Sequence, residues 1–61
     1  MDATGSSSSS LSEQLKAEGN MLYCERNFRG AYEKYTQALL HDDKNAILYS
    51  NRAACSLGLS K

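Results

Sequence analysis

Apolar residues recur at helical spacing in three segments of the chain, and short polar stretches separate these segments. The middle segment has the clearest stripe, whose members lie at i, i+3, i+7, i+10 and i+11: Phe28, Ala31, Tyr35, Ala38 and Leu39. Residues at this spacing share one face of an α-helix, so that face can be buried against a neighbour. The pattern predicts a helix over about residues 28–40.

The same periodicity continues on both sides of the middle segment. It predicts one helix over about residues 11–25 and another over about residues 46–58. Residues 1–9 are rich in serine and nearly free of apolar side chains, so they bury too little surface to offset the entropy of ordering, and we expect a disordered leader. Short loops force neighbouring helices to pack antiparallel. The sequence predicts an all-α, antiparallel three-helix arrangement within residues 10–61.

Polar residues and one glycine mark the expected helix ends. Ser10 and Glu13 lie three residues apart, the spacing of a capping box at a helix N-terminus. Asn27 and Asn45 precede the second and third segments, where an asparagine oxygen can accept a free backbone amide. We expect Gly58 to end the third helix.

Charge and composition exclude several classes of function. Seven Lys and Arg balance seven Asp and Glu, so no net field attracts nucleic acid or an anionic membrane surface. No apolar run approaches the roughly 18–20 residues that span a bilayer, and the N-terminus does not resemble a secretory signal. We therefore expect a cytoplasmic or nuclear chain with no nucleic-acid or membrane partner.

The reactive side chains follow no pattern of catalysis or metal binding. Cys24 and Cys55 lie within predicted helices without CxxC spacing, and His41 is the single histidine. We expect both thiols to be reduced and structural, because a free cysteine packs as a small apolar residue. The sequence also lacks a Gly-rich phosphate loop and a nucleophile with an obvious base. No catalytic residue, cofactor or metal is predicted.

The chain repeats itself with a period of about 34 residues. Shifted by that distance, Leu15 falls on Tyr49 and Gly19 falls on Ala53. A glycine inside a helix costs about 1 kcal/mol relative to alanine. Gly19 therefore indicates that another helix approaches closely at this position.

The segment from about Ser12 to Leu57 resembles a tetratricopeptide repeat protein, over about three quarters of the chain. The stretches LKAEGN, FRGAYEKYTQAL and NAILYSNRAA carry the resemblance, with these signature residues: Leu15, Gly19, Leu22, Phe28, Ala31, Tyr35, Ala38, Tyr49 and Ala53. Four positions depart from the repeat pattern: Glu18, Asp43, Arg52 and Ser56. The resemblance implies a helical hairpin plus one further helix, or about one and a half repeats.

Such arrays usually need at least about three repeats to bury a continuous core. We therefore expect the chain to be the N-terminal fragment of a longer protein, with a natural start at Met1. The third helix should leave an unmated face that contains some of these residues: Ile47, Leu48, Ala54, Cys55, Leu57 and Leu59. That face is a candidate surface for self-association.

The order LKxxGN followed by LYSNRAA resembles the co-chaperone subclass, which includes the organising and the small glutamine-rich co-chaperones. In that subclass the matching residues belong to a carboxylate clamp, and the resemblance assigns this role to Lys16, Asn20 and Asn51. It implies binding of the acidic C-terminal tail of seventy- and ninety-kilodalton heat-shock chaperones. Lys16 and Asn20 are four residues apart and share one helix face. The clamp's remaining Lys and Arg would lie beyond Lys61.

Two other functions stay open. The chain could be a tetratricopeptide scaffold for another partner, or the adaptor segment of a larger enzyme such as an isomerase, a phosphatase or a ubiquitin ligase. Three side chains also have structural interpretations. We expect Arg52 to form an ion pair, and Tyr23 and Tyr49 to pack with wet hydroxyls.

Overall fold

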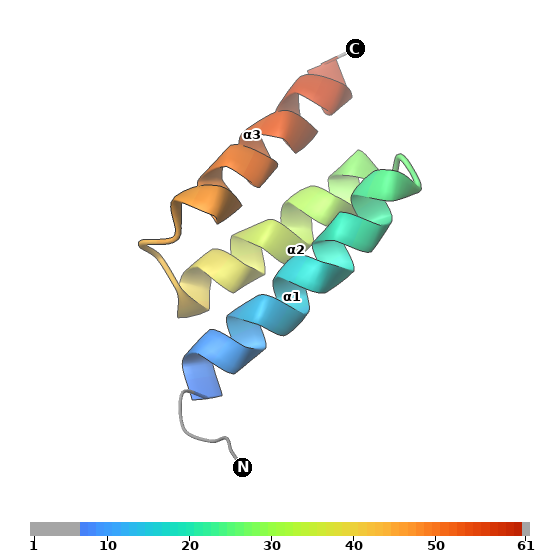
Figure 1. Cartoon of the computed structure of the whole chain (residues 1–61). Helices are drawn as coiled ribbons and strands as arrows, with labels where there is room; N and C mark the ends of the chain where they lie inside the picture. The colour runs from blue at the N-terminus through green and yellow to red at the C-terminus, as the bar shows by residue number, and fades with distance from the viewer. Residues whose placement is uncertain (1–6, 61) are drawn as a thin grey trace.

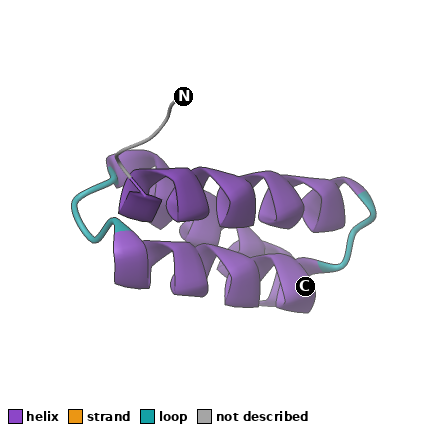
Figure 2. Cartoon of the chain, turned by 90° about the horizontal axis from the view of Figure 1, so that it is seen from below, coloured by secondary structure: helices purple, strands orange, loops and turns teal. Residues whose placement is uncertain are grey.

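A computed structural model of the chain describes residues 7–60 and contains three helices in succession. These are α1 (Ser7–Cys24), α2 (Phe28–His41) and α3 (Ala46–Ser60). Each helix runs antiparallel to the one before it, and both α1 and α3 pack against α2 (Figures 1 and 2). The predicted all-α arrangement, a helical hairpin plus one further helix, is confirmed.

The helices extend further than predicted at both ends of the described segment. α1 begins at Ser7, so Ser10 and Glu13 lie inside the helix and the predicted capping box at its start is wrong. The rest of the expected leader, residues 1–6, lies outside the described residues. α3 continues through Gly58 to Ser60. One serine or glycine costs a growing helix about 1 kcal/mol or less, which is too little to end it.

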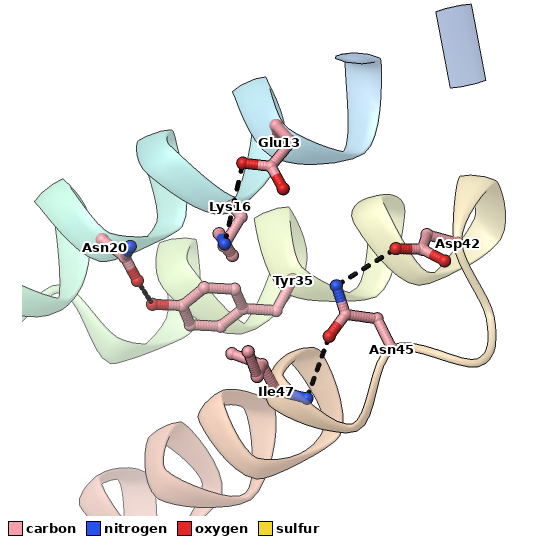
Figure 3. A network of polar contacts seen from close by, with 7 residues as sticks. All are labelled: Glu13, Lys16, Asn20, Tyr35, Asp42, Asn45 and Ile47. Atoms are coloured by element: carbon pink, nitrogen blue, oxygen red, sulfur yellow. Dashed lines mark hydrogen bonds and ion pairs between the residues drawn. The ribbon is translucent and has the colours of Figure 1, made fainter. Parts of the chain in front are cut away.

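Both predicted asparagine caps are confirmed. Asn27 Oδ1 accepts a hydrogen bond from the Gly30 amide at 3.1 Å, at the start of α2. Asn45 Oδ1 accepts one from the Ile47 amide at 3.0 Å, and its Nδ2 donates to Asp42 Oδ2 at 3.1 Å (Figure 3). Each cap satisfies a free amide in the first helical turn, and together they set where α2 and α3 begin.

The core is formed by side chains from all three helices. Its buried members are Leu15, Ala31, Tyr35, Ala38, Leu39, Leu48 and Cys55, with Leu22 and Phe28 packed against them. All five residues of the stripe predicted for α2 are among them, four buried and Phe28 packed against the buried set. Two signature residues, Tyr49 and Ala53, are instead exposed, away from the side of α3 that Leu48 and Cys55 bury.

Two glycines make room for aromatic rings of α2. A Cβ added at Gly19 would lie 2.7 Å from Tyr35 Cε1, and one added at Gly58 would lie 2.8 Å from Phe28 Cδ2. Carbon atoms in ordinary contact are about 3.5–4.0 Å apart. The predicted close approach at Gly19 is therefore confirmed, and Gly58 allows α3 to pack beside Phe28 rather than ending the helix.

Two departures from the repeat pattern have contacts that explain them. Glu18 Oε1 pairs with Lys34 Nζ at 2.9 Å, which links α1 to α2, and this ammonium lowers the pKa of the Glu18 carboxyl. The Arg52 guanidinium lies 5.6 Å from the ring centroids of both Tyr32 and Tyr49. No carboxylate of residues 7–60 pairs with Arg52, so the expected ion pair is replaced by two cation–π contacts.

Part of the surface of α3 is apolar and uncovered. Ile47, Leu57 and Leu59 are 56%, 70% and 51% exposed, whereas Leu48 and Cys55 are fully buried against the rest of the fold. Three of the six residues considered for the unmated face are therefore exposed, but Leu57 and Leu59 are two residues apart and do not share one side of the helix. Within the described residues, none of the helices combines the length and the apolar character needed to cross a membrane.

We expect Gly19→Ala to destabilise the fold although alanine is the better helix former. The new methyl would collide with the buried Tyr35 ring, and such overpacking costs about 1–3 kcal/mol against a propensity gain of about 1 kcal/mol. Urea unfolding followed by circular dichroism measures the difference. Ala17→Gly, at an exposed site on the same helix, is the control for helix propensity alone. A Gly19→Ala chain that is more stable than the wild type would contradict the close approach of Tyr35 to Gly19.

Candidate functional site

A hollow of about 320 Å³ opens between α1 and α3. Residues of all three helices line it: Asn20, Tyr23 and Cys24 from α1, Tyr35 from α2, and Asn51 and Ala54 from α3. Tyr35 is only 2% exposed and forms the floor, while the two asparagines stand on opposite walls. None of the lining residues is an aspartate, glutamate, lysine, arginine or histidine.

The structure brings two of the three predicted clamp residues to this hollow. Asn20 and Asn51 both line it, whereas Lys16 lies one turn before Asn20 on α1 and is not part of its wall. Lys16 Nζ is 3.7 Å from Glu13 Oε1, and the two side chains are 24% and 67% exposed (Figure 3). A partly solvated ion pair at this distance stabilises by about 1 kcal/mol or less, which is weaker than a charge-assisted hydrogen bond to a carboxylate.

α3 carries Asn51 to the hollow because its neighbours on the same helix face are buried. Leu48 and Cys55 lie three residues before and four residues after Asn51, and both are fully buried. Side chains at these spacings lie on the same side of a helix. The docking of α3 on α2 therefore turns Asn51 inward, which accounts for an asparagine at the centre of an apolar helix.

The side chain of Asn20 is fixed by a hydrogen bond from a buried tyrosine. Tyr35 Oη donates a hydrogen bond to Asn20 Oδ1 at 2.5 Å (Figure 3). Burial raises the pKa of the Tyr35 phenol, and nearby Cys55, Tyr23 and Cys24 raise it further. The phenol is therefore protonated at neutral pH, and within residues 7–60 the Nδ2 group of Asn20 keeps both hydrogens available for a ligand.

Sequence reasoning missed four residues that line the hollow: Tyr23, Cys24, Tyr35 and Ala54. For Tyr23 and Cys24 a signal was available, because they follow Asn20 by three and four residues and so share its helix face. Tyr23 also packs, with its ring 5.2 Å from that of Phe28 at an interplanar angle of 72°. The polar role of Tyr35 had no sequence signal, because its contact with Asn20 crosses from one helix to another.

A second hollow, of about 450 Å³, continues the first toward the end of α3. The two share Tyr23 and Ala54, and the second is also lined by Arg26, Phe28, Leu57 and Gly58. The combined surface places hydrogen-bond donors at one end and mostly apolar side chains at the other.

The chain is similar to several curated proteins over most of its own length. It is 44% identical over 45 residues to the heat shock protein sti1 homolog of Schizosaccharomyces pombe, which covers 74% of this chain and 8% of that protein. It is 48% identical over 48 residues to the small glutamine-rich tetratricopeptide repeat-containing protein beta of Rattus norvegicus, covering 79% of this chain and 16% of that protein. The stress-induced-phosphoprotein 1 of Caenorhabditis elegans is 42% identical over 45 residues, and the match covers 74% of this chain and 14% of that protein.

No family model matches the chain, and no solved structure gives a significant match. The three helices and the relatives together define a tetratricopeptide repeat segment. The chain is homologous over most of its length to tetratricopeptide repeat co-chaperones, which confirms the resemblance read from its motifs. It spans between 8% and 16% of the length of the three relatives named here.

The two cysteines are both free but differ in access, which a thiol reagent can measure. Cys24 is exposed at the hollow, contrary to the packed position expected for it, whereas Cys55 is fully buried and burial raises the pKa of its thiol. We expect the exposed Cys24 thiol to react rapidly with a disulfide reagent. The buried Cys55 thiol should react only as the chain unfolds, because the reagent cannot reach it and the reactive thiolate is disfavoured there. Cys24→Ser should leave only the slow phase, and two equally fast thiols would contradict the burial of Cys55.

Proposed function

We propose that this chain is a non-enzymatic binding module that holds the C-terminal carboxylate of an acidic peptide, as the N-terminal part of a tetratricopeptide co-chaperone. The proposed ligand is the tail of a seventy- or ninety-kilodalton heat-shock chaperone, which places the protein in the cytoplasm or nucleus. The observation that carries the proposal is the convergence of Asn20 and Asn51 on one hollow. The relatives support it, since two of the three are named as heat-shock or stress-induced proteins.

The chemistry of the hollow supports a carboxylate ligand. Asn20 and Asn51 can each donate amide hydrogens, and Lys16 supplies a positive charge one turn away. Hydrogen bonds to a charged group contribute about 1.5–3 kcal/mol each. Because the lining residues themselves are uncharged, the ligand's negative charge meets no carboxylate inside the hollow.

The proposal implies weak binding by this chain alone. The resemblance assigns two further clamp residues, a Lys and an Arg, to a helix beyond Lys61. Two missing charge-assisted contacts weaken binding by about 3–6 kcal/mol, or roughly 10²–10⁴-fold. Binding should therefore be measured by NMR titration of the isotopically labelled chain, which detects millimolar affinities.

We expect the chain to bind an acidic C-terminal peptide as the free acid and to bind its C-terminal amide at least about ten-fold more weakly, because the amide lacks the terminal charge. Asn51→Ala should remove most of this preference. Gln37→Ala, which deletes an exposed carboxamide of α2 outside the hollow, is the matched control. The free acid should also slow alkylation of Cys24, which lines the hollow.

Equal affinity for acid and amide would contradict the carboxylate clamp and favour a scaffold with another partner. An enzyme that carries this segment as an adaptor remains compatible with either result, because its catalytic residues would lie outside this chain. The acid preference thus tests the site itself and is independent of what the rest of the protein does.

As a second proposal, we propose that exposed apolar residues of α3 support self-association of the chain. Ile47, Leu57 and Leu59 are each more than half exposed, and burying any of them against a second copy would be favourable. Sedimentation velocity should show concentration-dependent dimers, and Leu57→Ser should shift the chain toward monomer. Leu40→Ser, at a 79% exposed leucine of α2, should leave association unchanged. A monomer with a sharp thermal transition at all concentrations would contradict this proposal.

A further inference from the structure

We infer that Tyr35 is a positioning residue for the proposed peptide site: its hydroxyl holds the Asn20 side chain with the carbonyl turned inward and the NH₂ group toward the hollow. The inference rests on the proposed function, because it concerns how that site presents its donors. Asn20 Oδ1 and Tyr35 Oη are 2.5 Å apart, and both residues line the same hollow (Figure 3).

The Tyr35 ring is well placed to hold another side chain because it has almost no freedom of its own. It is 2% exposed, and one edge lies against the backbone of Gly19, where even a methyl group would collide with it. Ala31 and Ala38, one turn away on each side of Tyr35 along α2, are fully buried. The hydroxyl is thus a fixed point at the floor of the hollow, directly beside the exposed Asn20.

The orientation of the Asn20 amide decides whether it attracts or repels a carboxylate. The two ends of a carboxamide are similar in size and opposite in hydrogen bonding, so an unconstrained asparagine can present either end. With Oδ1 bonded to Tyr35, only the NH₂ group is turned outward. Ordering this side chain before the ligand arrives removes part of the entropy lost on binding.

The reverse orientation would remove the hydrogen bond that the structure shows. If Nδ2 pointed inward and donated to the phenol oxygen, the phenol hydrogen would lose Asn20 Oδ1 as its acceptor. A buried hydroxyl that loses its acceptor costs about 1–3 kcal/mol. Burial raises the pKa of the Tyr35 phenol, so it remains a donor at neutral pH.

Asn51 offers an internal comparison. It lines the same hollow, but among the side chains of residues 11–60 none forms a hydrogen bond with its amide. The two walls therefore differ: Asn20 is pre-oriented by a core residue, and Asn51 is free to adjust to the ligand. The proposed action of Tyr35 on the ligand passes through Asn20, so removing Asn20 should remove the effect of the Tyr35 hydroxyl.

The test is Tyr35→Phe, which removes the hydroxyl and retains the ring. We expect affinity for the free-acid peptide to fall by about three- to ten-fold, the equivalent of one hydrogen bond, and affinity for the amide to stay unchanged. Tyr49→Phe is the matched control, because it removes a tyrosine hydrogen bond of similar length, 2.7 Å to Asp43 O, outside the hollow. It should bind both peptides as the wild type does.

A double-mutant cycle separates positioning from general damage to the fold. In an Asn20→Ala background, Tyr35→Phe should have no effect on the acid affinity, because the side chain through which it acts is gone. An equal loss in both backgrounds would mean a purely structural role and would overturn the inference. The inference would also be overturned if Tyr35→Phe kept the wild-type preference for the free acid over the amide, although the proposed function would then stand. If the wild-type chain itself does not distinguish the acid from the amide, the inference and the proposed function both fail.

A measurement on the wild-type chain keeps the inference testable if Tyr35→Phe does not fold. The chemical shifts of the Asn20 Nδ2 hydrogens should change when the free-acid peptide is added. The nuclear Overhauser contacts of these hydrogens with neighbouring α1 side chains should be at least as strong as any contact with the Tyr35 hydroxyl hydrogen. A dominant contact between the Nδ2 hydrogens and the hydroxyl would show the opposite orientation and would overturn the inference.

Discussion

The contact between the Tyr35 ring and the backbone of Gly19 is the constraint on which the hairpin and the hollow both depend. A large ring from α2 can enter α1 only where α1 lacks a side chain, and Gly19 is that place. The same ring fills the core, forms the floor of the hollow and reaches Asn20. A change that displaces it would therefore loosen the α1–α2 packing and the proposed site together.

The second requirement is the docking of α3, which completes the hollow. Leu48 and Cys55 bury one side of α3, and Asn51 lies between them on that side. Arg52 reinforces this docking at the edge of the interface, through its contacts with Tyr32 of α2 and with Tyr49. The two polar residues at the centre of α3 therefore differ in position: Asn51 lines the hollow, and Arg52 packs against tyrosine rings.

The hollow combines hydrogen-bond donors with a low charge, which suits the carboxylate ligand proposed for it. Two carboxamides provide direction without the desolvation penalty of buried charges, and Lys16 remains partly solvated. Selectivity for a terminal carboxylate would then depend on where the donors stand more than on the net charge of the protein, which is zero. The adjoining apolar hollow extends the surface along which a peptide could lie.

The sequence by itself determined the three helices, the two asparagine caps and the close approach at Gly19, because periodicity, capping and glycine cost are local properties of a chain. The motifs that carry the family resemblance also singled out Asn20 and Asn51, which the structure brings to one hollow. It misjudged the start of α1 and the role of Gly58, since one weak residue does not end a growing helix. Only the tertiary structure decided that Arg52 stacks on tyrosines, that Cys24 is exposed, and that Tyr35 bonds Asn20. These outcomes depend on contacts between helices, and the spacing within one helix does not encode the rotation of its neighbour.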